Sequence, residues 1–265
     1  MLIHRELSYI MTKLKAAGIH LLFSILIVAT VFAIMYFLWY PKGYFTIMGG
    51  KVLLALIGGV DIFLGPLLTL VVFKTGKKSL KFDLFCIGLA QIAALTYGVY
   101  VMFEARPVFT VFNKDKFQIA AVVDIVDYEL AKAKSPQMRQ LSVIGPKLVA
   151  IGEPDKNNKK EVIFAMMESE SAYRYPKLFD EYNAHKVKVI KAGKALAGLA
   201  KISTENKLVI DQFITKSNRP ETDFLYLPIA SELAEMSAIV DAKTGDFIQI
   251  IDAKQQAEKT ESAIN

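Results

Sequence analysis

One stretch of the chain, residues 52–73, constrains the fold more than any other. It is an apolar run of 22 residues between Lys51 and Lys74, and its one charged residue is Asp61. As a helix that rises about 1.5 Å per residue it would be roughly 30 Å long, which matches the hydrocarbon core of a bilayer. The run therefore predicts a transmembrane helix that carries a carboxylate inside the membrane.

The residues around this acid predict a helix that packs closely against other protein. An ionisable side chain at the centre of a bilayer costs about 2.5–3.5 kcal/mol on insertion scales, so Asp61 is expected to face a protein partner. Gly58, Gly59 and Gly65 allow neighbouring helices to approach, and Pro66 removes one backbone hydrogen bond and favours a kink.

Two further apolar runs complete a predicted three-helix transmembrane region over residues 1–104, with helices at about 17–40, 52–73 and 84–103. The first run lacks charge from Ala16 to Pro41, and the third lacks charge from Leu84 to Phe103. A cleaved signal peptide is the alternative for the first run, but the run is too long for one and no A-x-A site follows. Met11 is an alternative start, because residues 1–10 add nothing that the helix needs.

Positive charge is distributed unevenly and predicts the orientation. Residues 104–265 carry 23 residues of each sign, so the net charge of +6 arises in residues 1–103. The side of the N-terminus has seven basic residues, namely Arg5, Lys13, Lys15, Lys74, Lys77, Lys78 and Lys81. The other side has Lys42 and Lys51. The positive-inside rule therefore predicts a bacterial inner (cytoplasmic) membrane protein with a cytoplasmic N-terminus and a periplasmic C-terminal region. A nucleic-acid partner is not expected, because the larger region has no basic excess.

Depth matching across the three helices predicts one polar layer. Counting inward from the outer end of each helix places Thr30, Asp61, Gln91 and Thr96 within about one helical turn of each other. Two interpretations stay open. The layer is either an internal clasp that satisfies Asp61, or Asp61 offers its carboxylate to an incoming helix.

Residues 105–253 are predicted to form a single α+β extracytoplasmic domain, followed by a flexible polar tail at 254–265. Short strands are expected at 108–112, 117–123, 148–151 and 224–229, and a hairpin at 237–251 that turns at Gly245. Helices are expected from Asp124 to about Lys134, within 161–168, within 186–201 and at 208–214, with a polar loop at 157–160.

The motifs of enzymes are missing from the sequence, so no catalytic activity, cofactor or metal is expected. Cys86 is the one cysteine, and the three histidines carry no ligand spacing. Nucleophile motifs, phosphate loops and dinucleotide fingerprints are absent. The acid pairs Asp124 with Asp127 and Glu168 with Glu170 are expected to be surface or capping residues. His185 is expected in an exposed loop.

The membrane region resembles the TfpX/TfpZ family of type IV pilin accessory proteins. The resemblance is specific over about residues 13–110 and diffuse beyond, at 145–146 and 239–245. The stretches that carry it are KAAGIHLL (15–22), WYP (39–41), GVDIFLGPLLT (59–69), FK (73–74), LKFDL (80–84), Gln91, YG (97–98) and ARPV (105–108).

The resemblance implies a chaperone-like factor that binds type IV pilin before or during its extraction from the membrane, and so promotes pilus assembly and twitching motility. Its implied partners are the pilin subunit, other pilus assembly machinery and membrane lipid. The expected contact residues, or intramembrane polar layer, are Asp61, Gly65, Pro66, Thr30, Gln91 and Thr96. A membrane sensor with a ligand-binding periplasmic domain is the alternative function, although no cytoplasmic output domain is present. A membrane enzyme that modifies pilin is a third.

Overall fold

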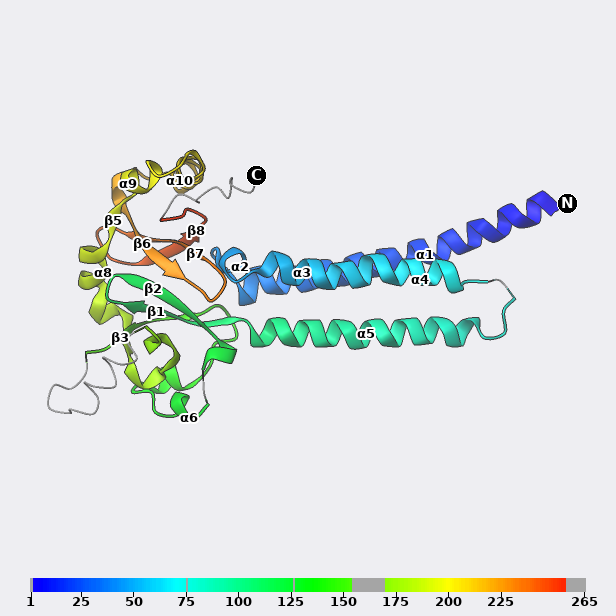
Figure 1. Cartoon of the computed structure of the whole chain (residues 1–265), viewed down its shortest axis with the longest axis horizontal. Coiled ribbons are helices and arrows are strands. Elements are labelled where there is room, and N and C mark those ends of the chain that lie inside the picture. The colour runs from blue at the N-terminus through cyan, green and yellow to red at the C-terminus, as the bar shows by residue number, and fades with distance from the viewer. Residues whose placement is uncertain (1, 75, 126, 154–169, 256–265) are drawn as a thin grey trace, which may run out of the picture. The chain divides into compact units, whose positions relative to one another are not determined.

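The computed structural model describes residues 2–74, 76–125, 127–153 and 170–255, which fall into two compact units. Unit 1 comprises the chain up to Phe37 together with Gly49–Glu104, and it is helical. Unit 2 comprises Leu38–Met48 together with the chain from Ala105 onward, and it is an α+β domain (Figure 1). The predicted class, three long apolar helices followed by an α+β domain, is therefore confirmed.

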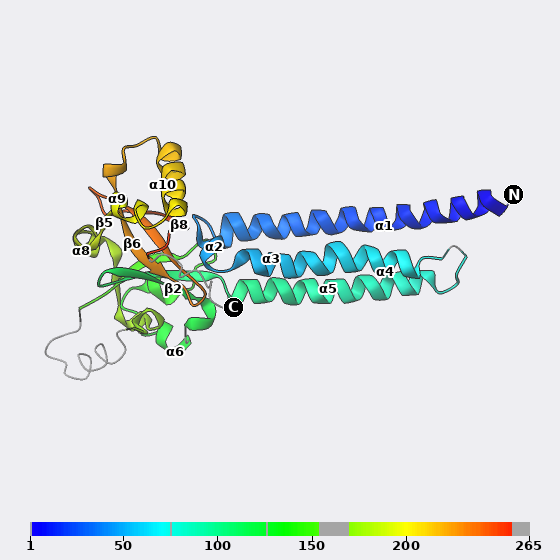
Figure 2. The same ribbon diagram turned by 45° about the horizontal axis from the view of Figure 1, so that its top comes forward.

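Among the described residues, three helical spans are long and apolar enough to cross a membrane, at Met11–Trp39, Gly50–Val72 and Leu80–Glu104. They belong to unit 1, except that the last two residues of the first span fall in unit 2. They lie side by side in both views of the chain (Figures 1 and 2). The helical segments are α1 (Leu2–Ala33), the π-helix η1 (Ile34–Trp39), α3 (Gly50–Gly58), the π-helix η2 (Gly59–Leu64), α4 (Gly65–Val72) and α5 (Leu80–Glu104). The helix of the first span begins earlier than predicted, because residues 2–16 contain neither glycine nor proline to end it.

The second span is interrupted by a π-helical turn where the sequence predicts a kink. Pro66 has no amide hydrogen, and its ring would clash with the carbonyl one turn earlier in a regular α-helix. The chain responds with the wider turn η2 (Gly59–Leu64), after which α4 resumes at Gly65 with Pro66 in its first turn. Asp61 lies within η2, and π-helical turns of this kind are frequent at functional sites.

Unit 2 is built on a mixed sheet that has eight strands among the described residues, in the order β4-β3-β1-β2-β6-β7-β8, with β5 paired to β6. The strands are β1 (Pro107–Asn113), β2 (Lys116–Ala121), β3 (Lys147–Ile151), β4 (Phe179–Glu181), β5 (Lys194–Ala195), β6 (Phe224–Ala230), β7 (Glu235–Asp241) and β8 (Phe247–Ile251). The pairs β1–β3 and β2–β6 are parallel, and the other pairs are antiparallel. The parallel pair β2–β6 therefore joins the N-terminal hairpin to the C-terminal meander.

Short helices close two hydrophobic cores of this sheet. One core combines β6, β7 and β8 with α9 (Leu196–Ala200) and α10 (Thr204–Ser217). The other lies on β1, β3 and β4, where the ring centroids of Phe109 in β1 and Phe179 in β4 are 5.1 Å apart. The remaining helical segments are α6 (Asp127–Leu130), α8 (Lys186–Ala192), and the 3-10 turns at Val122–Asp124, Pro136–Arg139, Ala172–Arg174, Pro176–Leu178, Tyr182–His185 and Glu221–Asp223.

The segment Leu38–Met48 belongs to the core of unit 2, although the sequence assigned residues 38–48 to the transmembrane region. Tyr40 and Ile47 are fully buried, and Tyr44, in the short helix α2 (Tyr44–Ile47), is 3% exposed. The Tyr44 hydroxyl hydrogen-bonds the hydroxyl of Thr110 in β1, and its ring stacks on Phe247 of β8. The linker between the first two spans is thus a structural part of the sheet domain.

Two backbone hydrogen bonds and one tight glycine turn hold this segment in place. The Ile250 amide donates to the Lys42 carbonyl at 3.0 Å, and the Gly145 amide donates to the Leu38 carbonyl at 2.8 Å. Gly43 has a φ of +92°, and a Cβ there would lie 2.4 Å from the Ile250 carbonyl oxygen. The turn therefore requires glycine both for its left-handed conformation and for the close approach of β8.

The expected strands of unit 2 are present, and the hairpin turn places Gly245 at a φ of +71°. The continuous helix expected from Asp124 to about Lys134 is wrong. Asp124 instead accepts the Ala121 amide at 2.8 Å and ends a 3-10 turn, and α6 is a separate short helix. Residues 186–201, within which one helix is expected, contain two short helices, α8 and α9, separated by Gly193 and by β5, which pairs with β6. The loop expected at 157–160, the helix at 161–168 and most of the tail lie outside the described residues.

Candidate functional site

Asp61 is the buried carboxylate of unit 1, with 5% of the residue exposed. Its Oδ1 accepts a hydrogen bond from Gln91 Nε2 at 3.4 Å, which is longer than the usual range of about 2.7–3.2 Å. Its Oδ2 is buried and has no hydrogen-bond partner among the described residues. An unmet buried acceptor of this kind costs about 1–3 kcal/mol, so the carboxylate is only half satisfied within unit 1.

Gly65 and Gln91 determine how the carboxylate is held. Gly65 lies one turn after Asp61, and a Cβ at this position would come within 2.2 Å of Gln91 Nε2. The absence of a side chain at Gly65 therefore gives the amide of Gln91 room to reach Asp61. Pro66 affects the backbone conformation around Asp61. Its missing amide hydrogen favours the π-helical turn that precedes it and contains the carboxylate.

The predicted layer of four polar side chains is brought together only in part. The structure places Gln91 beside Asp61. The Thr30 hydroxyl donates to the Leu26 carbonyl at 2.8 Å, and the Thr96 hydroxyl donates to the Ile92 carbonyl at 2.7 Å, and both residues are exposed. Threonine in a helix commonly satisfies its hydroxyl in this way, and so it gives no partner to Asp61.

A second polar contact crosses unit 1, and the sequence analysis did not find it. His20 Nδ1 and Thr69 Oγ1 are 2.6 Å apart and join α1 to α4, and Thr69 is 3% exposed. Ser24, one turn after His20, is also buried. His20 and Thr69 both fall in the sequence blocks that carry the family resemblance, and this was the available signal for the pair.

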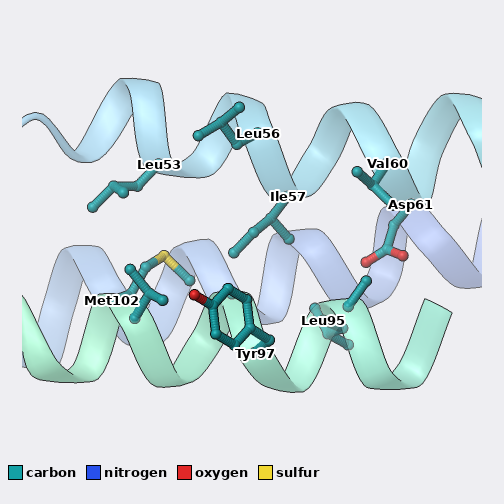
Figure 3. A pocket seen from close by; sticks show the side chains of 11 residues that line it. Leu53, Leu56, Ile57, Val60, Asp61, Leu95, Tyr97 and Met102 are labelled. Atoms are coloured by element: carbon teal, nitrogen blue, oxygen red, sulfur yellow. The ribbon is translucent and has the colours of Figure 1, made fainter. Parts of the chain in front are cut away.

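An apolar groove lies between the second and third spans, with Asp61 at one end (Figure 3). Its volume is about 230 Å³. Asp61 is the one charged residue that lines it within the described part of the chain, and in Figure 3 the carboxylate points toward α5. Lining side chains include Leu53, Leu56, Ile57 and Val60 of the second span and Leu95, Tyr97 and Met102 of α5.

The groove has a tightly packed floor and an exposed mouth. A Cβ on Gly98 would lie 2.8 Å from the side chain of Ile57, so glycine lets α5 approach α3 here. Leu56 is 65% exposed and Tyr97 is 70% exposed. The groove therefore presents apolar side chains at its mouth, and the Asp61 carboxylate lies at one end of it.

The buried carboxylate of unit 2, Glu129, is held differently. Its side chain is 4% exposed, and its two oxygens lie 2.8 Å from Lys132 Nζ and 3.4 Å from Lys177 Nζ. Burial alone would raise the pKa of Glu129, but the two lysines together hold that pKa below its ordinary value. Glu129 Oε2, like Asp61 Oδ2, is buried and has no hydrogen-bond partner among the described residues, but the ion pair with Lys177 balances its charge and ties α6 to the 3-10 turn Pro176–Leu178.

Other polar residues of unit 2 have structural partners. Glu170 pairs with Lys116 at 2.7 Å, and Arg174 bridges Glu232 and the Tyr173 hydroxyl. His185 is buried against Asp180 at 3.3 Å, so the expectation of an exposed loop histidine is wrong. The side chains of Asp127 and Glu168 lie outside the described residues. Within the described residues, no three His, Cys, Asp or Glu side chains are grouped as a metal site.

Comparison with known proteins finds relatives that cover most of the chain. The family model "Fimbrial assembly protein FimB" matches residues 8–49. The "Fimbrial assembly protein, serogroup E1" and the "Fimbrial assembly protein, serogroup I" of Dichelobacter nodosus are each 31% identical over 232 residues, which is 86% of this chain and 90% of each relative. The protein of serogroups C1 and C2 is 39% identical over 121 residues, or 45% of this chain and 92% of that relative. No solved structure matches.

Proposed function

The chain belongs to the fimbrial assembly proteins, and from that premise we propose that it is an accessory protein of the TfpX/TfpZ kind that binds the fimbrial subunit in the membrane. Binding takes place before or during extraction of a type IV pilin subunit, and it keeps the subunit ready for assembly. The role is chaperone-like and includes no catalytic step. Other parts of the pilus assembly machinery are further partners.

The observation that supports this proposal is the unmet Asp61 oxygen at the end of the apolar groove. The occupant that we propose is a transmembrane helix of the fimbrial subunit. Its apolar side chains would cover Leu56 and Tyr97, which are exposed at the mouth. A hydrogen-bond donor on that helix, such as a free N-terminal amine, would pair with Asp61 Oδ2. Helix association in lipid depends on such packing and hydrogen bonds, because lipid tails are as apolar as the helices.

The proposed location is the bacterial inner membrane, with the N-terminus in the cytoplasm and unit 2 in the periplasm. Seven basic residues against two support this orientation by the positive-inside rule. A periplasm-active reporter fused after Val123 is expected to be active, and a cytoplasm-active reporter at Gly76 is expected to be active. The reverse pattern would overturn the orientation without affecting the proposed groove.

Crosslinking from the groove tests the proposed function. A photoreactive phenylalanine analogue in place of Tyr97 is expected to crosslink to the fimbrial subunit in living cells. The matched control is Phe85, which is 63% exposed on the same helix and does not line the groove. Equal crosslinking from both positions, or none from Tyr97, would reject the groove as the binding site.

Deletion of the gene tests the assembly role itself. We expect loss of surface fimbriae and of twitching motility while the subunit is still synthesised, because the subunit would lack its membrane partner. The mass of the subunit should be unchanged, since the proposed role modifies nothing. Normal fimbriae in the deletion strain would refute the role, and an altered subunit mass would favour an enzyme.

A further inference from the structure

Two loops of unit 2 expose apolar side chains at their tips. Val143 is 56% exposed and Ile144 is 71% exposed in the loop before β3. Leu233 is 72% exposed in the turn between β6 and β7. Single exposed apolar residues are common on protein surfaces, so exposure alone decides nothing. What distinguishes these tips is the set of residues to which their loops are hydrogen-bonded.

The first loop is hydrogen-bonded to the chain at two places, at the end of the first span and just after the end of the third. The Gly145 amide donates to the carbonyl of Leu38 at 2.8 Å, and the first span ends at Trp39. Arg106 Nε donates to the Ser142 carbonyl at 3.1 Å, and the third span ends at Glu104. Val143 and Ile144 therefore lie between Ser142 and Gly145. The hydrogen-bond partners of these two flanking residues, Arg106 and Leu38, are each within two residues of the end of a span.

The second loop is hydrogen-bonded to the chain just before the second span begins. Ser231 Oγ donates to the Ile47 carbonyl at 2.8 Å, and the second span begins at Gly50. The same hydroxyl accepts the amides of Leu233 and Ala234, so it also shapes the turn that carries Leu233. Each of the three places where the chain passes between a membrane span and unit 2 is thus hydrogen-bonded to one of these two loops, and each loop carries exposed apolar side chains at its tip.

We propose that Val143, Ile144 and Leu233 insert into the boundary between lipid headgroups and acyl chains, and so anchor unit 2 to the membrane surface. Leu38, Ile47 and Arg106, to which the two loops are hydrogen-bonded, lie at or within three residues of the ends of the membrane spans, where this boundary lies. Burial of apolar side chains at the boundary is favourable in proportion to the area removed from water. Lys42, exposed in the segment Leu38–Met48, provides a positive charge suited to anionic headgroups. The inference does not depend on the proposed binding of a fimbrial subunit.

Fluorescence on the full-length protein in lipid nanodiscs tests this anchor. Cys86 is the one cysteine, so a Cys86→Ser background allows single labels at Ile144→Cys and Leu233→Cys. The control is Val187→Cys, which is 64% exposed on α8, on the opposite side of unit 2 from α2 (Figures 1 and 2). The nanodiscs contain phosphatidylethanolamine and phosphatidylglycerol, and no fimbrial subunit is present.

An environment-sensitive dye at positions 144 and 233 is expected to emit at shorter wavelength than at position 187. Lipids brominated near the headgroup should quench the first two positions and spare the third, and aqueous iodide should do the reverse. Iodide quenching of all three positions to the same extent would overturn the proposal. Protection of positions 144 and 233 that appears only after a fimbrial subunit is added would also overturn it, in favour of a protein contact.

Discussion

Among the described residues each unit has one buried carboxylate, Asp61 in unit 1 and Glu129 in unit 2, and the two differ in how their charge is paired. Glu129 of unit 2 has a lysine near each oxygen, at 2.8 and 3.4 Å. Asp61 of unit 1 has the neutral amide of Gln91 at 3.4 Å on one oxygen and no hydrogen-bond partner for the other within the described residues. Both carboxylates have one buried oxygen without a hydrogen-bond partner among the described residues, so the difference lies in the charge: two lysines pair with Glu129, whereas the hydrogen-bond donor to Asp61 is a neutral amide.

We interpret this difference in charge pairing as a stabilising role for Glu129 and as support for the proposed binding role of Asp61. A buried carboxylate that is paired on both sides contributes to the domain that contains it, and loss of one partner is costly. A carboxylate that is half paired inside a membrane is costly as it stands, and a partner with a donor removes that cost. We therefore expect changes at Glu129 to alter stability, and changes at Asp61 to alter binding.

The largest effect on stability is expected from a substitution in Leu38–Met48, because this segment contributes buried side chains to the core of unit 2. Tyr44→Ala should lower the free energy of unfolding of unit 2 by about 3–5 kcal/mol, because it removes a buried aromatic ring. Trp39 is the one tryptophan of the chain and lies in the same segment. Its fluorescence during urea unfolding of the detergent-solubilised protein measures the change.

The matched control is Tyr128→Ala, because Tyr128 is 62% exposed on α6. Its cost should be about 1 kcal/mol or less, because its one aromatic contact among the described residues is with Lys132 Nζ, 4.5 Å from the ring centroid. If Tyr44→Ala were equally mild, Leu38–Met48 would be a passive linker and unit 2 would be complete without it.

A smaller loss is expected from Glu129→Gln, at about 1–3 kcal/mol near neutral pH, because the change leaves two lysines beside an uncharged group. The lowered pKa of Glu129 means that its ionised form stabilises the folded state. The wild type therefore loses this contribution as the pH falls through and below the ordinary glutamate pKa of about 4.3, and the variant does not.

Urea unfolding of both proteins at neutral and acidic pH measures this difference through Trp39. Glu170→Gln is the control, because Glu170 pairs with Lys116 but its side chain is 78% exposed. Exposed pairs contribute about 0–1 kcal/mol. A cost for Glu129→Gln that stays constant in acid would show that its charge does not stabilise unit 2.

The smallest effect is expected at Gly65. Gly65→Ala places a Cβ in the position of Gln91 Nε2, so the amide must turn away from Asp61. Intramembrane hydrogen bonds contribute about 0.6 kcal/mol on average. Gly59→Ala is the control, because nothing lies within 4 Å of a Cβ there and the gain in helix propensity is the same.

Helical circular dichroism during detergent denaturation compares these variants. Gly65→Ala should be less stable than Gly59→Ala, and Gln91→Ala should add nothing further to Gly65→Ala. Additive losses would mean that Gly65 does not act through Gln91, and Asp61 would then be less well held than the geometry indicates.

Local patterns in the sequence were sufficient for some features and not for others. Run length and charge predicted the three spans, and depth matching paired Asp61 with Gln91, because a helix has a regular rise. The same counting placed Thr30 and Thr96 beside Asp61, but it takes no account of a hydroxyl bonding to its own helix. The turn at Gly245 was predictable because a tight hairpin is a local structure.

The role of Leu38–Met48 was not predictable from such patterns. Tyr40 stands at the end of a run of membrane-spanning length in the sequence, where interfacial aromatic residues are common, yet both Tyr40 and Tyr44 are buried in unit 2. The Tyr44 hydroxyl hydrogen-bonds Thr110, and the Lys42 carbonyl accepts the Ile250 amide, and both partners are far away in the chain. The parallel pairs β1–β3 and β2–β6 were missed for the same reason, because only the folded sheet brings those strands together.

The central claim is that Asp61 binds a partner helix through its carboxylate, and substitution at Asp61 tests it most directly. Asp61→Asn retains an acceptor for Gln91 and removes the charge, whereas Asp61→Leu removes both. Crosslinking of the fimbrial subunit to position 97 is measured in each variant, together with the abundance of the protein in the membrane. We predict that the Asn variant stays as abundant as the wild type and loses subunit crosslinking. Wild-type crosslinking in the Asn variant, with low abundance of the Leu variant, would contradict the claim and leave Asp61 as a structural residue of unit 1.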